Sequence, residues 1–206
     1  MQIRFLAAAA AAVLAFSAPL RAQDADSAFA PNGLRPGAWS LSFAAPGSGS
    51  GERATLGAWR MVGARTNLGV TLGLALSDSE RDDDGQDTEE TDTSLQLGIN
   101  ARRYLALTRG VAPYVQGGVF AGTSTQQREV ADFEDRVESN FVGAEVAVGA
   151  EWFPVRQFSV AGHTGLRALR SQAELSATNP ADDENVDASG TGISTFTSAL
   201  SLQIYF

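Results

Sequence analysis

The amino-acid sequence predicts an all-β protein, an eight-stranded antiparallel up-and-down β-barrel that crosses a membrane. From Ala38 onward, apolar and polar residues alternate with a period of two, and no stretch has a convincing helical period. Short connections alternate with long polar segments along the chain. The sequence has no cysteine and no second apolar run of helix-spanning length, so a barrel is the expected route into a membrane.

The first 22 residues have the layout of a secretory signal peptide. Arg4 supplies a positive charge, and an apolar run from Phe5 to Phe16 follows it. The run is too short for a membrane span, which disfavours an N-terminal anchor, and the small residues after it predict cleavage following Ala22. We expect residues 23–37 to form a periplasmic N-terminal segment and residues 38–206 to form one barrel domain.

Eight strand candidates follow from the alternation and from the polar breaks. Their ranges are 38–45, 53–62, 67–77, 93–105, 112–125, 139–152, 158–170 and 190–206. In the last range, every second residue from Phe196 to Phe206 falls on a mostly apolar face, and the residues between them are mostly small or polar. An apolar outside and a polar inside are what surrounding lipid and a packed polar lumen require.

Charge separates the two kinds of connection. Of the 24 acidic residues, nine lie in 78–92, five in 126–138 and five in 171–189, whereas the short turns carry Arg65, Arg109 and Arg156. Outer-membrane barrels have short periplasmic turns and longer extracellular loops. We therefore expect three solvated acidic extracellular loops and both termini in the periplasm. The net charge of −9 and the absence of lysine argue against a nucleic-acid partner.

Aromatic residues gather at the predicted periplasmic ends of the strands. They are Trp39, Tyr104, Tyr114, Trp152, Phe153, Phe158, Tyr205 and Phe206. Amphipathic rings prefer the membrane–water interface, so these residues are predicted to form a periplasmic aromatic belt.

The terminal strand ends in Leu200-Ser201-Leu202-Gln203-Ile204-Tyr205-Phe206. This ending resembles the C-terminal signature of bacterial outer-membrane proteins, in which an aromatic final residue is read by the barrel-assembly machinery. Residues 38–206 resemble the small eight-stranded barrels of the OmpA membrane-domain and OmpX type, from Gram-negative bacteria. The resemblance implies a monomer in the bacterial outer membrane, in contact with outer-membrane lipid and lipopolysaccharide.

Side chains fill the interior of an eight-stranded barrel, so an open diffusion pore is not expected. The inward positions include a polar cluster of Arg102, Glu145, Glu151, His163 and Arg167. A three-residue turn between Pro154 and Phe158 would place Glu145 opposite Arg167, and we predict a buried ion pair there. We interpret the cluster as a charge network that holds the barrel together, with a gated ion path as the alternative.

The acidic run from Glu80 to Asp87 resembles part of a calcium loop, because spaced carboxylates and a glycine suit that ion. Asp82, Asp84 and Asp87 are its weak candidate ligands. The twelfth position from Glu80 is Thr91 and not the expected bidentate glutamate, so no dedicated metal site is predicted. Divalent cations that bridge these carboxylates to lipopolysaccharide phosphates stay open as a looser role.

The predicted function is non-enzymatic, a structural or surface-interaction role in which the acidic loops meet the environment and no cofactor takes part. One alternative is a lipid A-modifying enzyme, because such barrels use a histidine with a serine and a carboxylate. His163 is the only histidine. It falls on the inward face and its nearest serine in sequence is Ser159, which departs from that pattern. A narrow ion-conducting channel is the second alternative.

Overall fold

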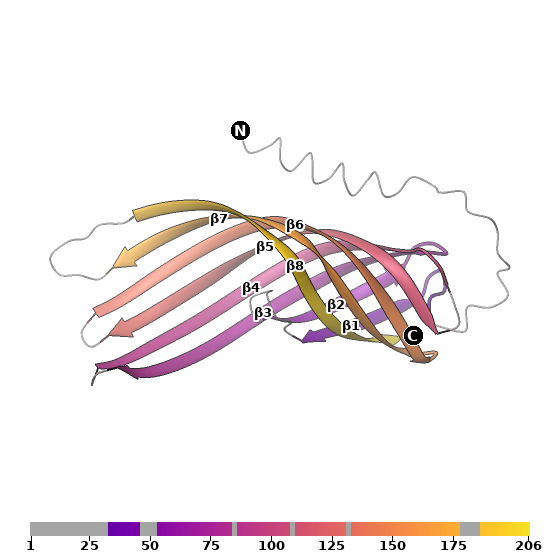
Figure 1. The fold of residues 1–206 in the computed structure, drawn as a ribbon, viewed down its shortest axis with the longest axis horizontal. Helices are drawn as coiled ribbons and strands as arrows, with labels where there is room; N and C mark the ends of the chain where they lie inside the picture. Colours follow the sequence, from indigo (N-terminus) through magenta and orange to yellow (C-terminus); the bar gives the residue numbers. More distant parts are fainter. Residues whose placement is uncertain (1–32, 46–52, 84–85, 108–109, 131–132, 178–185) are drawn as a thin grey trace.

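The protein is an all-β closed barrel, in which each strand pairs antiparallel with its neighbours in chain order and β1 pairs with β8 (Figure 1). The computed structural model describes residues 33–45, 53–83, 86–107, 110–130, 133–177 and 186–206. The eight strands are β1 (Trp39–Ala45), β2 (Ala54–Met61), β3 (Thr66–Asp83), β4 (Gln86–Tyr104), β5 (Val111–Val130), β6 (Phe133–Val155), β7 (Phe158–Ala177) and β8 (Val186–Tyr205). The predicted fold class is confirmed.

Within those described residues, no helix is long and apolar enough to cross a membrane. The expected signal peptide, residues 1–22, lies outside them.

The strands differ greatly in length. β1 and β2 have 7 and 8 residues, whereas β3 to β8 have between 18 and 23. About 9–11 residues of a tilted strand are enough to cross a bilayer. The long strands therefore continue beyond the eight-stranded part and project together from one end of the barrel (Figure 1).

We call the projecting part the distal extension and define it as the outermost eight residues of each long strand: 76–83, 86–93, 123–130, 133–140, 170–177 and 186–193. The rest is the barrel half, and the end of it that holds both described termini is the terminal end. None of the side chains described in the distal extension is buried.

The three expected acidic loops are mostly strand, which corrects the sequence prediction. Only residues 84–85 separate β3 from β4, only 131–132 separate β5 from β6, and 178–185 separate β7 from β8. The reason is that both faces of the distal extension meet solvent. Apolar alternation disappears there while the main-chain ladder continues, and a hydrophobic period detects burial and not hydrogen bonding. At the terminal end, by contrast, the strand ends agree with prediction to within one residue, except that β6 continues to Val155.

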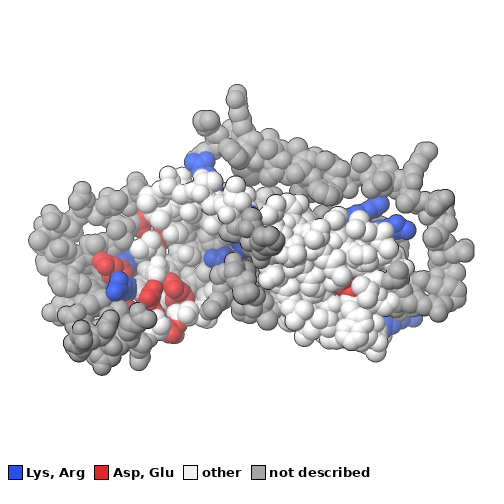
Figure 2. Space-filling model, viewed as in Figure 1, with Lys and Arg blue, Asp and Glu red and all other residues white. Residues whose placement is uncertain are grey.

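Large apolar side chains cover the outside of the barrel half. They include Leu41 and Phe43 of β1, Leu68, Val70 and Leu74 of β3, Leu95, Leu97 and Ile99 of β4, Val142, Val146 and Val148 of β6, and Leu200, Leu202 and Ile204 of β8, all exposed. In Figure 2 the barrel half is mostly uncharged, and most of the visible acidic atoms lie at the distal end. This is the outer surface that a bilayer-embedded barrel requires.

Inside the barrel, large side chains lie against glycines of the neighbouring strand. A Cβ added at Gly69 would collide with the Trp59 indole, and one added at Gly143 would collide with the Phe120 ring. These inward glycines make room for rings that extend over the neighbouring strand, which is how a narrow barrel accommodates large residues.

Residues 33–38 fold across the lumen at the terminal end. Leu34 is 1 % exposed and belongs to a buried apolar cluster with Met61, Phe153 and Tyr205. The Gly37 amide, at a φ of 85°, donates to the Met61 carbonyl at 2.7 Å. The end of the expected periplasmic segment 23–37 is therefore packed onto the barrel and caps its lumen.

Candidate functional site

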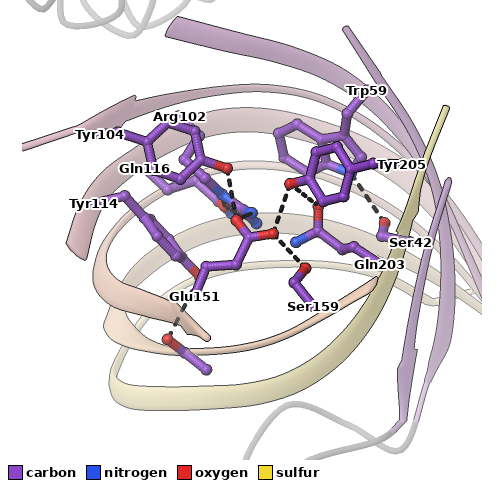
Figure 3. Close-up of polar contacts among 11 residues, drawn as sticks. Ser42, Trp59, Arg102, Tyr104, Tyr114, Gln116, Glu151, Ser159, Gln203 and Tyr205 are labelled. Atoms are coloured by element: carbon purple, nitrogen blue, oxygen red, sulfur yellow. Dashed lines mark hydrogen bonds and ion pairs between the residues drawn. The ribbon is translucent and has the colours of Figure 1, made fainter. Parts of the chain in front are cut away.

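The terminal half of the lumen is organised around one buried carboxylate, Glu151 of β6 (Figure 3). Its Oε2 accepts from Arg102 Nη1 at 3.2 Å and from the Tyr104 hydroxyl at 2.6 Å. Its Oε1 accepts from the Tyr205 hydroxyl at 2.6 Å and from the Ser159 hydroxyl. Each carboxylate oxygen thus receives two hydrogen bonds from the protein, which satisfies a buried charge.

Arg102 of β4 is equally well satisfied. Its Nε and Nη2 donate to Gln116 Oε1 at 3.2 and 3.1 Å. Its guanidinium also lies 4.1 Å from the Tyr114 ring centroid and 4.7 Å from that of Trp59, both within cation–π range. The Arg102–Glu151 cluster links side chains of the five strands from β4 to β8.

A cavity of about 120 Å³ lies in the lumen next to this cluster. Its polar lining includes Arg53, Gln96, Arg102, Glu145, His163 and Arg167. All five residues of the predicted polar cluster therefore face the lumen. Four of them line the cavity, and Glu151 is buried beside it, bonded to Arg102. Arg53 was not among the predicted site residues, although it lies just before β2 and has the same parity as the inward residues Thr55, Gly57 and Trp59. That parity is the signal that could have identified it.

The predicted Glu145–Arg167 ion pair does not form, although the two residues are Cα partners of β6 and β7 as expected. Among the described residues the ion pairs are Arg102–Glu151 and Arg136–Glu138. Arg167 instead donates to Gln96 Oε1 and lies 3.9 Å over the Phe120 ring, while Glu145 accepts from Gln116 Nε2 at 3.1 Å. The long arginine side chain reaches past its cross-strand partner to a ring that Gly143 leaves room for.

His163 lines the cavity between β6 and β8, with Gly149 and Ala199 as its Cα partners. Its Nδ1 is buried and has no hydrogen-bond partner among the described residues. Ser159, the nearest serine in sequence, donates to Glu151 instead.

The aromatic belt prediction is wrong for the three tyrosines. Tyr104, Tyr114 and Tyr205 are at most 4 % exposed and lie in the lumen, and Phe153 is also buried there. Trp39, Trp152 and Phe206 do lie outside, at 46, 53 and 65 % exposure, and Phe158 is half-buried. Two of the tyrosine hydroxyls are hydrogen-bonded to Glu151, a buried acceptor that clustering along the sequence does not reveal.

Of the weak metal candidates, Asp84 lies outside the described residues. Asp82 and Asp87 are described in their backbone only, as Cα partners of the β3–β4 hairpin. A calcium loop wraps successive residues around one ion, whereas these two lie on separate strands.

Comparison with known proteins gives a family. The model of the outer membrane protein beta-barrel domain matches residues 8–195. A major outer membrane protein from Thermus thermophilus has a similar structure, with a TM-score of 0.52 at 13 % identity over 84 % of this chain and 100 % of that chain. The structure of CarO2 from Acinetobacter baumannii has a TM-score of 0.44 at 10 % identity, over 84 % of this chain and 99 % of that chain. The structure of Ail, the attachment invasion locus protein of Yersinia pestis, has a TM-score of 0.38 at 12 % identity, over 84 % of this chain and 100 % of that chain. No curated protein matches in sequence.

Proposed function

The chain belongs to the outer membrane protein beta-barrel domain family, and on that premise we propose that it is a non-enzymatic barrel whose distal extension interacts with the surroundings of the cell. It is a bacterial outer-membrane protein. The extension, and not the lumen, is the part through which we propose that it acts.

The observation that carries this proposal is the continuation of six strands past the apolar outer surface. The acidic side chains described in the extension are Asp78, Glu89, Glu90, Asp92, Asp135, Glu138 and Glu174. The other acidic side chains that the structure describes, Glu145 and Glu151, lie in the lumen. A sheet that projects from a membrane barrel and exposes this much charge suits polar partners, including lipopolysaccharide bridged by divalent cations.

The proposed orientation puts the terminal end in the periplasm. Both described termini meet there, since the Trp39 amide donates to the Phe206 carbonyl at 3.2 Å and the Phe206 amide returns a bond to Trp39 at 3.0 Å. Short periplasmic turns are usual in outer-membrane barrels.

The filled lumen favours this role over a channel. Leu34, Met61, Tyr104 and Tyr205 are each at most 4 % exposed at the terminal end, and the Arg102–Glu151 cluster lies directly beside them. Ions would have to displace these side chains to pass.

Epitope insertion tests the display of the extension. A tag inserted between Val130 and Phe133 should be labelled by antibody on intact cells, whereas a tag inserted in the turn 105–110 should be labelled only after permeabilisation. The reverse pattern would refute the orientation and with it the proposed role.

Two further measurements separate the alternatives. We expect lipid A mass spectra of cells that express the protein to match those of cells lacking it, and we expect planar bilayers to show no single-channel steps. A change in lipid A that disappears in the His163→Ala variant would establish the enzyme instead. Conductance steps from the refolded protein would establish the channel.

A further inference from the structure

Two arginines from separate parts of the barrel wall donate to one neutral oxygen. Arg53, just before β2, donates through Nη1 to Gln96 Oε1 at 3.2 Å, and Arg167 of β7 donates through Nη2 to the same oxygen. All three residues line the lumen cavity. A neutral amide oxygen is a weak partner for two cations at once, because hydrogen bonds to a charged acceptor are stronger.

The surrounding charges do not neutralise this arginine pair. No described carboxylate lies within ion-pair distance of Arg53 or Arg167. Glu145 lies on the cavity wall and accepts from the neutral Gln116 amide, and Glu151 pairs with Arg102. Three guanidinium groups therefore face two carboxylates, which leaves one positive charge in excess at the cavity of a chain whose net charge is −9.

Donor atoms around the cavity are also left over. The Nε atoms of Arg53 and Arg167 and the Nδ1 atom of His163 are buried and have no hydrogen-bond partner among the described residues. Buried polar groups are normally satisfied. These atoms show that the described residues do not supply enough acceptor oxygens for the arginine donors around the cavity.

Aromatic rings hold the two guanidinium groups in place. The Arg53 Cζ atom lies 4.8 Å from the Phe141 ring centroid, and the Arg167 Cζ atom lies 3.9 Å from that of Phe120. The two rings are themselves in tilted contact, with centroids 6.4 Å apart. A planar guanidinium fixed on a ring keeps its fork of N–H donors directed, which is the geometry that recognises carboxylate and phosphate groups.

We propose that this cavity binds a small oxyanion, a carboxylate or phosphate group, that bridges Arg53 and Arg167. The volume of about 120 Å³ suits a group of a few heavy atoms and not a whole lipid. Because buried side chains fill the terminal end, the anion enters from the distal extension. The group can belong to a free anion or to the headgroup of a lipid. This site goes beyond the proposed role of the extension and does not depend on it.

Trp59 supplies a signal for binding, because its ring also lines the cavity. The chain has three tryptophans, so a Trp39→Phe/Trp152→Phe background leaves Trp59 as the emitter. The detergent-refolded full mature chain, in phosphate-free buffer at constant ionic strength, is titrated with inorganic phosphate, with acetate, and with phosphatidic acid in mixed micelles against a phosphatidylcholine control. We expect a saturable change in Trp59 fluorescence.

The variants locate the site. Arg53→Gln and Arg167→Gln should each raise the dissociation constant at least tenfold. Arg170→Gln should leave it unchanged, because Arg170 is on the same strand as Arg167 but is exposed on the other face. Gln96→Glu provides a second route if an arginine variant does not refold, since it offers the two arginines an internal carboxylate. It should weaken anion binding at least tenfold while the heat-modifiable folded form persists.

The micelle titration distinguishes the two sources of the group. Saturation by phosphate or acetate assigns a free anion, and saturation by phosphatidic acid alone assigns a lipid headgroup. Absence of saturation with all three probes overturns the proposal. So does binding that is unchanged in folded Arg53→Gln, Arg167→Gln and Gln96→Glu proteins.

Discussion

The ion pairs of the barrel half and of the distal extension differ in a way that their lengths do not predict. Arg136–Glu138 in the extension is the shorter, at 2.7 Å, but its side chains are 48 and 56 % exposed. Arg102–Glu151 in the lumen measures 3.2 Å, with its side chains 3 and 0 % exposed. Water screens the first pair, so it contributes about 0–1 kcal/mol. Breaking a buried pair costs several-fold more, because the remaining charge loses its partner in a dry environment. Burial, and not the N···O distance, therefore decides which ion pair contributes more to stability.

The same contrast holds for the backbone. In the barrel half, all eight strands are paired around the lumen. In the extension, β3 beyond Leu74 and β8 before Leu200 have no strand on their outer edges among the described residues. No side chain described in the extension is buried. Strands with an unpaired edge and no buried side chains open more easily, so we expect the extension to open at a lower free energy than the barrel half.

The largest expected effect comes from removing the lumen carboxylate. Glu151→Gln leaves Arg102 buried without a counter-charge and should lower the free energy of unfolding by about 3–5 kcal/mol. Glu138→Gln, which removes the same charge from the exposed pair, should change it by less than about 1 kcal/mol. Urea unfolding of both variants in vesicles checks the difference. Equal losses would mean that the two regions do not differ in the way burial implies.

A charge on the outer surface should be the next largest perturbation. Leu97→Arg faces the bilayer and should cost about 2–4 kcal/mol if it lies near the midplane. Thr91→Arg, at the same parity of β4 but in the extension, should have little effect because that side chain is exposed beyond the apolar surface. The yield of heat-modifiable protein after refolding into vesicles is the measurement. A similar loss of yield for Thr91→Arg would show that the membrane boundary lies within the extension.

Glycines provide a smaller test of packing. Gly69→Ala puts a methyl group against the Trp59 indole and should cost about 1–3 kcal/mol. Gly192→Ala in the extension has no atom within 4 Å of the added Cβ and should change the free energy of unfolding by less than about 0.5 kcal/mol. Thermal unfolding in detergent, followed by circular dichroism, compares them. A neutral Gly69→Ala would show that the lumen is loosely packed there.

Acidification should give the smallest effect, and in the extension alone. Partial burial, and then the charge of Glu90, raise the pKa of Asp92. A raised carboxyl pKa means that the folded state binds the proton more tightly. Stability from this group is therefore present at low pH and is lost as the pH rises from its ordinary value near 4.

Hydrogen exchange, corrected for the intrinsic rate, checks the sign. Protection of the strands around Asp92, β3 to β5, should be slightly higher at pH 4.5 than at pH 7. Asp92→Asn should reduce the pH dependence, because it removes the titrating carboxyl group. Greater protection at pH 7 would contradict the argument.

Much of the barrel half could be predicted from the sequence. The strand ends at the short turns and the inward faces of Arg102, Glu145 and Glu151 follow from parity alone, because a period of two leaves one choice of face once lipid is outside. The predicted ion pair failed because a long side chain can reach beyond the residue directly opposite it on the next strand. Arg167 passes Glu145 to reach Phe120 and Gln96. Tyr104 and Tyr205 have the same parity as the inward residues Arg102 and Gln203, so parity predicts their lumen position, whereas the aromatic belt prediction relied on clustering alone. Strand parity does not encode which partner a long side chain selects.

The sequence by itself determined the fold class, the strand order and the apolar outer surface, because the alternation of side chains along a strand is a local property of the chain. Tertiary structure decided two other things. The polar segments became strands because neighbouring strands provide hydrogen-bond partners for their backbone, whatever their hydropathy. The arginines of the lumen gained their partners because barrel closure brings β2, β4 and β7 together around one cavity. Contacts across a closed sheet depend on register and tilt, and no single strand contains that information.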